Sequence, residues 1–129
     1  MSDTCHILVV DDEPIVGDRL KILLEKDGHS VENFIDPKAA SQRLEEKDFD
    51  IVISDIRMRE VDGIQFMNLV SQKSKRTKVI LITGYATLEL ARESLVKGAF
   101  DFIAKPFKSK EIRATIQKAI DCLKQKESK

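Results

Sequence analysis

Acidic, hydroxyl and lysine side chains follow the apolar runs of this sequence. Asp11 and Asp12 follow the first run, Asp55 a later one, Thr83 the next and Lys105 the last. If these runs are parallel strands, their carboxyl ends meet at one edge of a sheet, and the five side chains converge there. Three carboxylates within several ångströms repel one another unless a cation joins them. Oxygen ligands without histidine or thiol suit Mg²⁺.

A site of this composition fits phosphoryl chemistry. A metal and a lysine offset the charge on phosphoryl oxygens, and a hydroxyl can hydrogen-bond one of them. No thiol, histidine or serine–histidine pair is expected at the strand ends, so the best nucleophile there is a carboxylate. A lone aspartate after a strand is usually a helix cap or turn residue, as we predict for Asp36 and Asp62. The complete set is much harder to obtain by chance, which favours a functional site.

The elements that must position these residues are short apolar runs alternating with amphipathic segments. The apolar runs predict five strands, at 6–10, 30–34, 50–54, 78–82 and 100–103. Apolar residues at helical spacing predict five helices, at 13–27, 37–46, 63–72, 87–97 and 108 to about 125. Pro14 suits a first helical turn, and Gly28 and Gly98 suit helix ends. This alternation predicts an α/β fold with a parallel sheet covered on both faces.

The composition of the strands predicts their order. The runs ILVV, IVI and VILI are continuously apolar, as in central strands, whereas 30–34 and 100–103 carry polar residues, as edge strands can. The doubly wound, flavodoxin-like order 2-1-3-4-5 satisfies this pattern, and the six-stranded dinucleotide-binding order does not. We expect a single domain over 1–129, with its core at about 5–125 and a tail or the start of a linker at 126–129.

The composition narrows the classes of function. The chain has 129 residues, 42% hydrophobic and 34% charged, which is typical of one globular domain. Basic and acidic residues are equal at 22 each, so net charge gives no case for direct binding of nucleic acid or membrane. No apolar run approaches the roughly 20 residues that span a bilayer, and the first residues lack signal-peptide features, so we expect a cytoplasmic location. Cys5 and Cys122 are predicted to be reduced thiols, and His6 and His29 to be structural.

Several segments together resemble the receiver domains of two-component response regulators. They are VVDDEP at 9–14, SDIRM at 54–58, DG at 62–63, LITGYAT at 81–87 and KGAFDFIAKPF at 97–107. They occur in the order of that family over nearly the whole chain. ITGYAT and GAFDFIAKPF are most similar to NtrC-like receivers, whose full proteins often activate transcription. The resemblance implies a CheY-like fold and a signalling switch that is at most self-phosphorylating and self-dephosphorylating, not an enzyme acting on other substrates.

The resemblance also implies a role for each matched residue of the site. Asp55 would be the phosphoacceptor, taking its phosphoryl group from the phosphohistidine of a sensor histidine kinase or phosphotransfer protein. Asp12, Asp55 and the backbone carbonyl of Arg57 would ligate Mg²⁺ directly, and Asp11 mostly through water. Lys105, before an expected cis proline, would pair with the phosphoryl oxygens and with Asp55.

The signal would leave the site through two further residues. Thr83 would hydrogen-bond the phosphate, and Phe102 would turn inward as an aromatic switch residue. The face formed by 87–97, 100–103 and 108–125 would change, and a partner or a second copy would bind it, because phosphorylation shifts two pre-existing populations. We expect control of transcription through an effector domain absent from this chain; the alternative is a stand-alone receiver that acts through protein contacts.

Some positions depart from the family pattern. Arg59 stands where the family commonly has proline, and Phe102 lacks the hydroxyl of a tyrosine. Arg57 and Tyr85 are bulky and would flank the approach of water to the phosphate. We hypothesise that they slow hydrolysis of the phosphoaspartate.

Two other functions compete with the switch. Aspartyl-nucleophile phosphatases need a second acid two residues after the nucleophile, where this chain has Arg57, so we disfavour that function. A pseudo-receiver, a pure interaction module, would not need the complete set of acids, threonine and lysine.

Overall fold

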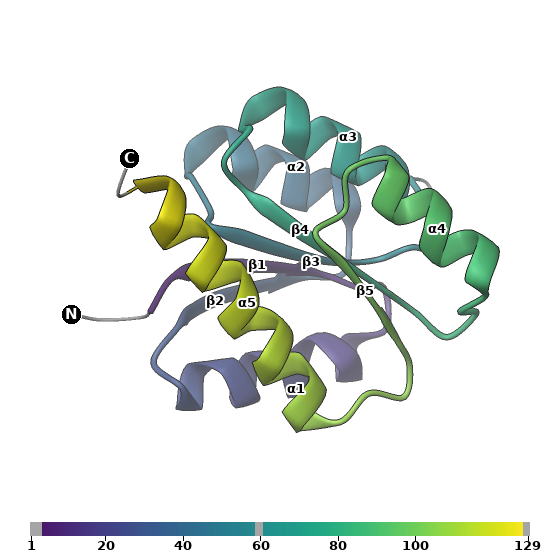
Figure 1. Ribbon diagram of the computed structural model, residues 1–129, viewed down its shortest axis with the longest axis horizontal. Helices are drawn as coiled ribbons and strands as arrows, with labels where there is room; N and C mark the ends of the chain where they lie inside the picture. Colours follow the sequence, from purple (N-terminus) through teal and green to yellow (C-terminus); the bar gives the residue numbers. More distant parts are fainter. Residues whose placement is uncertain (1–3, 59–60, 128–129) are drawn as a thin grey trace.

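A five-stranded parallel sheet lies between two layers of helices in the computed structural model, which describes residues 4–58 and 61–127 (Figure 1). The strands are β1 His6–Val10, β2 Ser30–Phe34, β3 Ile51–Asp55, β4 Lys78–Thr83 and β5 Asp101–Ala104. The helices are α1 Pro14–Lys26, α2 Pro37–Glu46, α3 Gly63–Lys73, α4 Leu88–Val96 and α5 Ser109–Glu127. The strand order is β2-β1-β3-β4-β5, which confirms the doubly wound order and the two predicted edge strands.

Each face of the sheet has its own apolar core. Alternate residues of a strand point to opposite faces, so Ile7 and Val9 pack on one side and Leu8 on the other. Helices α1 and α5 cover the first side, and α2 and α3, with α4 near the β5 edge, cover the second (Figure 1). Because the central strands are buried on both faces, polar side chains are left to the strand ends.

Three strands, β3, β4 and β5, end one residue later than the sequence predicted. The third strand was expected at 50–54 and the fourth at 78–82, but Asp55 pairs with Ile82 and Thr83 pairs with Ala104 in the sheet. Hydrogen-bonded pairing, rather than apolar character, therefore sets these strand ends. As a consequence Asp55 and Thr83 belong to the rigid sheet and not to the loops that follow it.

The ends of the helices follow their caps. Glu13 and Thr87, predicted as the first helical residues, are N-caps with extended backbone, and Asp27 and Lys97, predicted as the last, are C-caps. The remaining ends shift by two residues or fewer, α5 running to Glu127.

Predicted caps and stops are confirmed at several positions. The Asp36 side chain accepts a hydrogen bond from the Lys38 amide, and Asp62 forms a capping box with Gln65. Gly28 and Gly98 stop their helices at φ values of 93° and 116°, which a side chain would strain.

The two histidines lie away from the strand ends. His6 is exposed at the start of β1, and His29 is 9% exposed, its Nδ1 accepting a hydrogen bond of 3.2 Å from the Cys5 amide. Cys5 and Cys122 are free thiols, as predicted. Burial, with the charge of Asp50, raises the pKa of the Cys5 thiol to about 12, so this thiol stays protonated. Within 4–58 and 61–127, the chain forms no helix long and apolar enough to span a bilayer.

Candidate functional site

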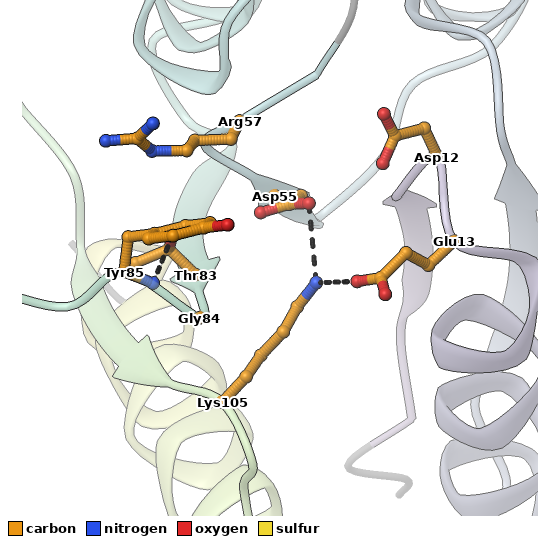
Figure 2. Close-up of a pocket in the computed structure, with 8 residues that line it drawn as sticks. All are labelled: Asp12, Glu13, Asp55, Arg57, Thr83, Gly84, Tyr85 and Lys105. Atoms are coloured by element: carbon orange, nitrogen blue, oxygen red, sulfur yellow. Dashed lines mark hydrogen bonds and ion pairs between the residues drawn. The ribbon is translucent and has the colours of Figure 1, made fainter.

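The carboxyl ends of the strands meet at an open pocket of about 660 Å³. Figure 2 shows the side chains that surround it. The pocket is lined by Asp12, Glu13, Asp55, Arg57, Thr83, Gly84, Tyr85 and Lys105. Asp11 is 1% exposed and borders the same cluster from below the surface. The five residues singled out in the sequence are therefore brought together in space.

Three carboxylates form the acidic part of this pocket. One oxygen from each of Asp11, Asp12 and Asp55 lies within 4.8 Å of the others. Burial, reinforced by the charge of Asp11, raises the pKa of Asp55 to about 6, and burial also raises the pKa of Asp11. The Oδ2 atom of Asp11 is buried, and the contact given for it is the Lys105 ammonium group 2.9 Å away. A buried, oxygen-only cluster with unsatisfied negative charge fits a hard divalent cation such as Mg²⁺.

Lys105 supplies the positive charge of the pocket. Its Nζ lies 2.8 Å from Glu13 Oε1, 2.9 Å from Asp11 Oδ2 and 3.3 Å from Asp55 Oδ2. Burial opposes the charged form, but hydrogen bonds to Glu13 and Asp11 outweigh it and raise the pKa of Lys105. The peptide bond from Lys105 to Pro106 is cis, as expected.

The opposite wall consists of a hydroxyl and a stacked pair. Thr83 is fully buried, and its Oγ1 accepts a hydrogen bond of 3.1 Å from the Tyr85 amide. The guanidinium of Arg57 stacks on the Tyr85 ring, with Cζ 4.4 Å from the ring centroid. In Figure 2 both side chains lie on the far side of Asp55 from Glu13. The pair therefore lines the pocket on one side of Asp55.

Two residues discussed in the sequence lie elsewhere. Phe102 is partly buried in β5, against the same apolar cluster as Leu90 of α4, and does not line the pocket. It therefore lies on the face of the sheet whose core Leu90 of α4 also contacts. Arg59 lies outside the described residues.

Glu13 is a charged pocket residue for which no role was predicted from the sequence. It stands directly after the two aspartates, at the position that caps α1, where a carboxylate ordinarily faces the first turn of its own helix. The signal is the acidic triplet at 11–13, but the helical pattern predicts its third member only as the first residue of the helix at 13–27.

A family model of the response regulator receiver domain matches residues 7–117. The chain belongs to this family. This receiver domain is 34% identical over 120 residues to the transcriptional regulatory protein FixJ of Bradyrhizobium diazoefficiens. It is 36% identical over 120 residues to the regulatory protein AtoC of Escherichia coli K12. Both alignments cover 93% of this chain, but 58% of FixJ and 26% of AtoC, so the receiver domain spans only part of these relatives.

Solved structures show the same fold. A response regulator receiver domain from Clostridium thermocellum is 29% identical with a TM-score of 0.87, over 93% of this chain and 97% of that one. The beryllofluoride-activated NtrC4 receiver domain, solved as a dimer, is 30% identical with a TM-score of 0.87, over 92% and 98% of the two chains. The sequence-based resemblance to CheY-like receivers of the NtrC-like class is thereby confirmed.

Proposed function

We propose that this receiver domain is a phosphorylation-driven switch in which Asp55 accepts a phosphoryl group from the phosphohistidine of a sensor histidine kinase or phosphotransfer protein. The observation that carries the proposal is the convergence of three carboxylates and Lys105 at one pocket. Asp55 is the acid in that cluster which ends the central strand β3 and faces the pocket. Because Asp55 is part of the sheet, its backbone is held rigidly, and the pocket beside its carboxylate has room for a phosphoryl group.

The side chains that would act directly in the transfer line the pocket. A carboxylate oxygen of Asp55 attacks the phosphorus, the phosphorus–nitrogen bond of the donor breaks, and its electron pair stays on the imidazole. Lys105 holds positive charge beside the phosphoryl oxygens, and the Thr83 hydroxyl donates a hydrogen bond to one of them.

Mg²⁺ is the cofactor that the donor set suits. Asp12, Asp55 and the backbone carbonyl of Arg57 would hold it directly, and Asp11 mostly through water. When bound, it would neutralise part of the negative charge that Asp55 and the phosphoryl group bring together. The raised pKa values of Asp55 and Asp11 support this assignment, because they mark carboxylates that lack sufficient compensating charge.

The output of the switch would pass from Thr83 to α4. The Thr83 hydroxyl now accepts a hydrogen bond from the Tyr85 amide. When this hydroxyl moves toward the phosphate, that hydrogen bond breaks, and the loop before α4 moves with it. Phe102 and Leu90 pack against the same apolar cluster, so Phe102 would respond to a shift of α4. The α4–β5–α5 face would then bind a second copy or an effector domain, through which the whole protein would control transcription.

The proposal is tested with a small phosphodonor. We expect acetyl phosphate and Mg²⁺ to add the mass of one phosphoryl group to the wild-type domain, and chelation of the metal to prevent it. The Asp55→Asn variant should stay unmodified, whereas Asp48→Asn, at an exposed aspartate outside the pocket, should behave like wild type. An unmodified wild-type domain would support a pseudo-receiver instead, and an adduct on Asp55→Asn would place the acceptor elsewhere.

A further inference from the structure

The carboxylate of Glu13 turns away from the helix that it begins. Glu13 is the N-cap of α1, yet its side chain makes no capping hydrogen bond. Instead its Oε1 accepts a hydrogen bond of 2.8 Å from Lys105, which lies 92 residues later in the chain. Figure 2 shows the two side chains meeting at the mouth of the pocket. A carboxylate at this position would normally stabilise its own helix, but that of Glu13 binds Lys105 instead.

Three acceptors already surround the ammonium group of Lys105. A lysine ammonium has three donor hydrogens, and Glu13, Asp11 and Asp55 each place an oxygen within 3.3 Å of Nζ. The contact with Glu13 is shorter than the contact with Asp55 by half an ångström (2.8 against 3.3 Å). Lys105 is therefore drawn toward the α1 side, and a phosphoryl oxygen on Asp55 must displace one acceptor.

The exposure of the three acids decides which acceptor leaves. The side chain of Glu13 is 60% exposed, whereas that of Asp11 is 0% and that of Asp55 is 7% exposed. Water can solvate the Glu13 carboxylate as soon as the lysine departs, so breaking an exposed ion pair costs little. A buried carboxylate left without its partner costs far more.

We propose that Glu13 is a positioning residue that holds Lys105 toward α1 in the unphosphorylated domain and releases it when a phosphoryl group occupies Asp55. This inference rests on the proposed function. Glu13 then competes with the phosphoryl oxygens for the same ammonium group. Its effect is to slow phosphorylation and to weaken binding of a phosphoryl mimic, without contacting the phosphoryl group itself.

Two substitutions separate the contact from the charge. Glu13→Ala removes both. It removes no capping hydrogen bond, because the Glu13 side chain makes none. Glu13→Asp keeps the charge but shortens the side chain, and aspartate at an N-cap turns back to the amide groups of its own helix. Glu25→Ala, at an exposed position of the same helix, is the control.

Phosphorylation by acetyl phosphate at saturating Mg²⁺, and affinity for beryllofluoride, are the first measurements. We expect both Glu13 variants to phosphorylate about three- to fivefold faster than wild type and to bind beryllofluoride more tightly by the same factor, the range that an exposed ion pair allows. Glu25→Ala should match wild type. If only Glu13→Ala is faster, the effect comes from charge and the positioning role is wrong; if neither is faster, the inference also fails.

A second measurement needs neither metal nor phosphate. Nuclear magnetic resonance of the Lys105 ammonium group in metal-free protein should show faster hydrogen exchange in both Glu13 variants than in wild type. Unchanged exchange in either variant would overturn the inference. A wild-type domain that takes no phosphoryl group at all would instead contradict the proposed function, so the two failures are distinguishable.

Discussion

Asp55 occupies an environment that opposes its own charge. The residue is 5% exposed, and burial together with the nearby charge of Asp11 raises its pKa to about 6, although Lys105 partly offsets both effects. At neutral pH the carboxylate is ionised at a cost to the fold. A cation or a phosphoryl–metal complex relieves that cost, so the chemistry of the site and the stability of the domain are linked.

Removing this charge should stabilise the metal-free domain. The pKa of Asp55 is about 6 in the fold, against about 3.9 when unfolded, so the cost is absent below about pH 4 and complete above about pH 6. We expect Asp55→Asn to raise the free energy of unfolding at pH 7 by roughly 1–3 kcal/mol. Urea unfolding of both proteins in chelator, from pH 4 to 7.5, measures the difference, which should grow with pH. A variant less stable than wild type at pH 7 would contradict this account.

The stacked pair Arg57–Tyr85 should lengthen the life of the phosphoaspartate. The two side chains stack at 4.4 Å and line the pocket on one side of Asp55, and an exposed cation–π pair contributes about 0.5–1 kcal/mol. We expect Arg57→Asn or Tyr85→Ala to raise the dephosphorylation rate about two- to fivefold. The double variant should be no faster than the faster single one, because the two side chains act as a unit.

Decay of radiolabelled phosphodomain gives these rates. Arg92→Asn, an exposed arginine of α4, serves as the control and should decay like wild type. Equal rates for the two pair variants and wild type would refute the hypothesis.

The composition of the site could be predicted from the sequence, but its contacts could not. Asp11, Asp55 and Lys105 follow apolar runs, and parallel strands must end at one edge, so their proximity was a consequence of topology. The direction of the Glu13 side chain depends on a lysine 92 residues away. No local pattern carries that information, since position 13 reads equally well as a helix cap.

At the scale of elements, the start of α3 is pressed against the strand that carries Asp55. The Gly63 amide donates a hydrogen bond of 2.7 Å to the Ile56 carbonyl. A Cβ atom on Gly63 would lie 2.7 Å from the Ile56 Cα and closer still to the Asp55 carbonyl oxygen, both of them backbone atoms. Only glycine permits this approach, which locks the backbone of β3 at the acceptor.

A side chain at position 63 should therefore damage both stability and function. We expect Gly63→Ala to lower the free energy of unfolding by roughly 1–3 kcal/mol, because the backbone must shift to admit the methyl group. Phosphorylation by acetyl phosphate should slow as Asp55 moves. Gly84→Ala is a matched control for stability, since a Cβ there meets no atom within 4 Å, and it should stay within about 0.5 kcal/mol. Equal urea midpoints for Gly63→Ala and wild type would contradict the prediction.

The elements themselves were predictable because periodicity and burial agree along most of the chain. Continuous apolar runs marked the central strands, and polar residues in 30–34 and 100–103 marked the edges. The boundaries depended on interactions that periodicity does not encode. Asp55 belongs to β3 because it pairs with Ile82. Thr87 is an N-cap and not the first helical residue, because its side chain accepts a hydrogen bond from the Leu90 amide.

At the scale of the molecule, α4 is the helix with the fewest buried residues among those that the structure describes. Among the described residues of α4, Ser94 alone is fully buried, and its hydroxyl bonds back to the Leu90 carbonyl. Leu88, Leu95 and Val96 are 69%, 48% and 85% exposed. A helix with one fully buried residue and a partly buried Leu90, and with large apolar side chains in solvent, is suited to move and to be covered by another surface.

We therefore expect activation to join two copies of the domain through α4. Beryllofluoride with Mg²⁺ should shift the wild-type domain from monomer to dimer in sedimentation velocity, as that ligand accompanies a dimer in the NtrC4 receiver. Val96→Asp should weaken the dimer by at least about tenfold, because association would bury an unpaired carboxylate. Ile22→Asp is the matched control: Ile22 is 65% exposed on α1, across the sheet from α4 (Figure 1), and the variant should dimerise like wild type. Phosphorylation of Val96→Asp should be unaffected, since the pocket does not include α4. If Val96→Asp dimerises as strongly as wild type, or if Ile22→Asp alone stays monomeric, the output surface lies on another face of the sheet.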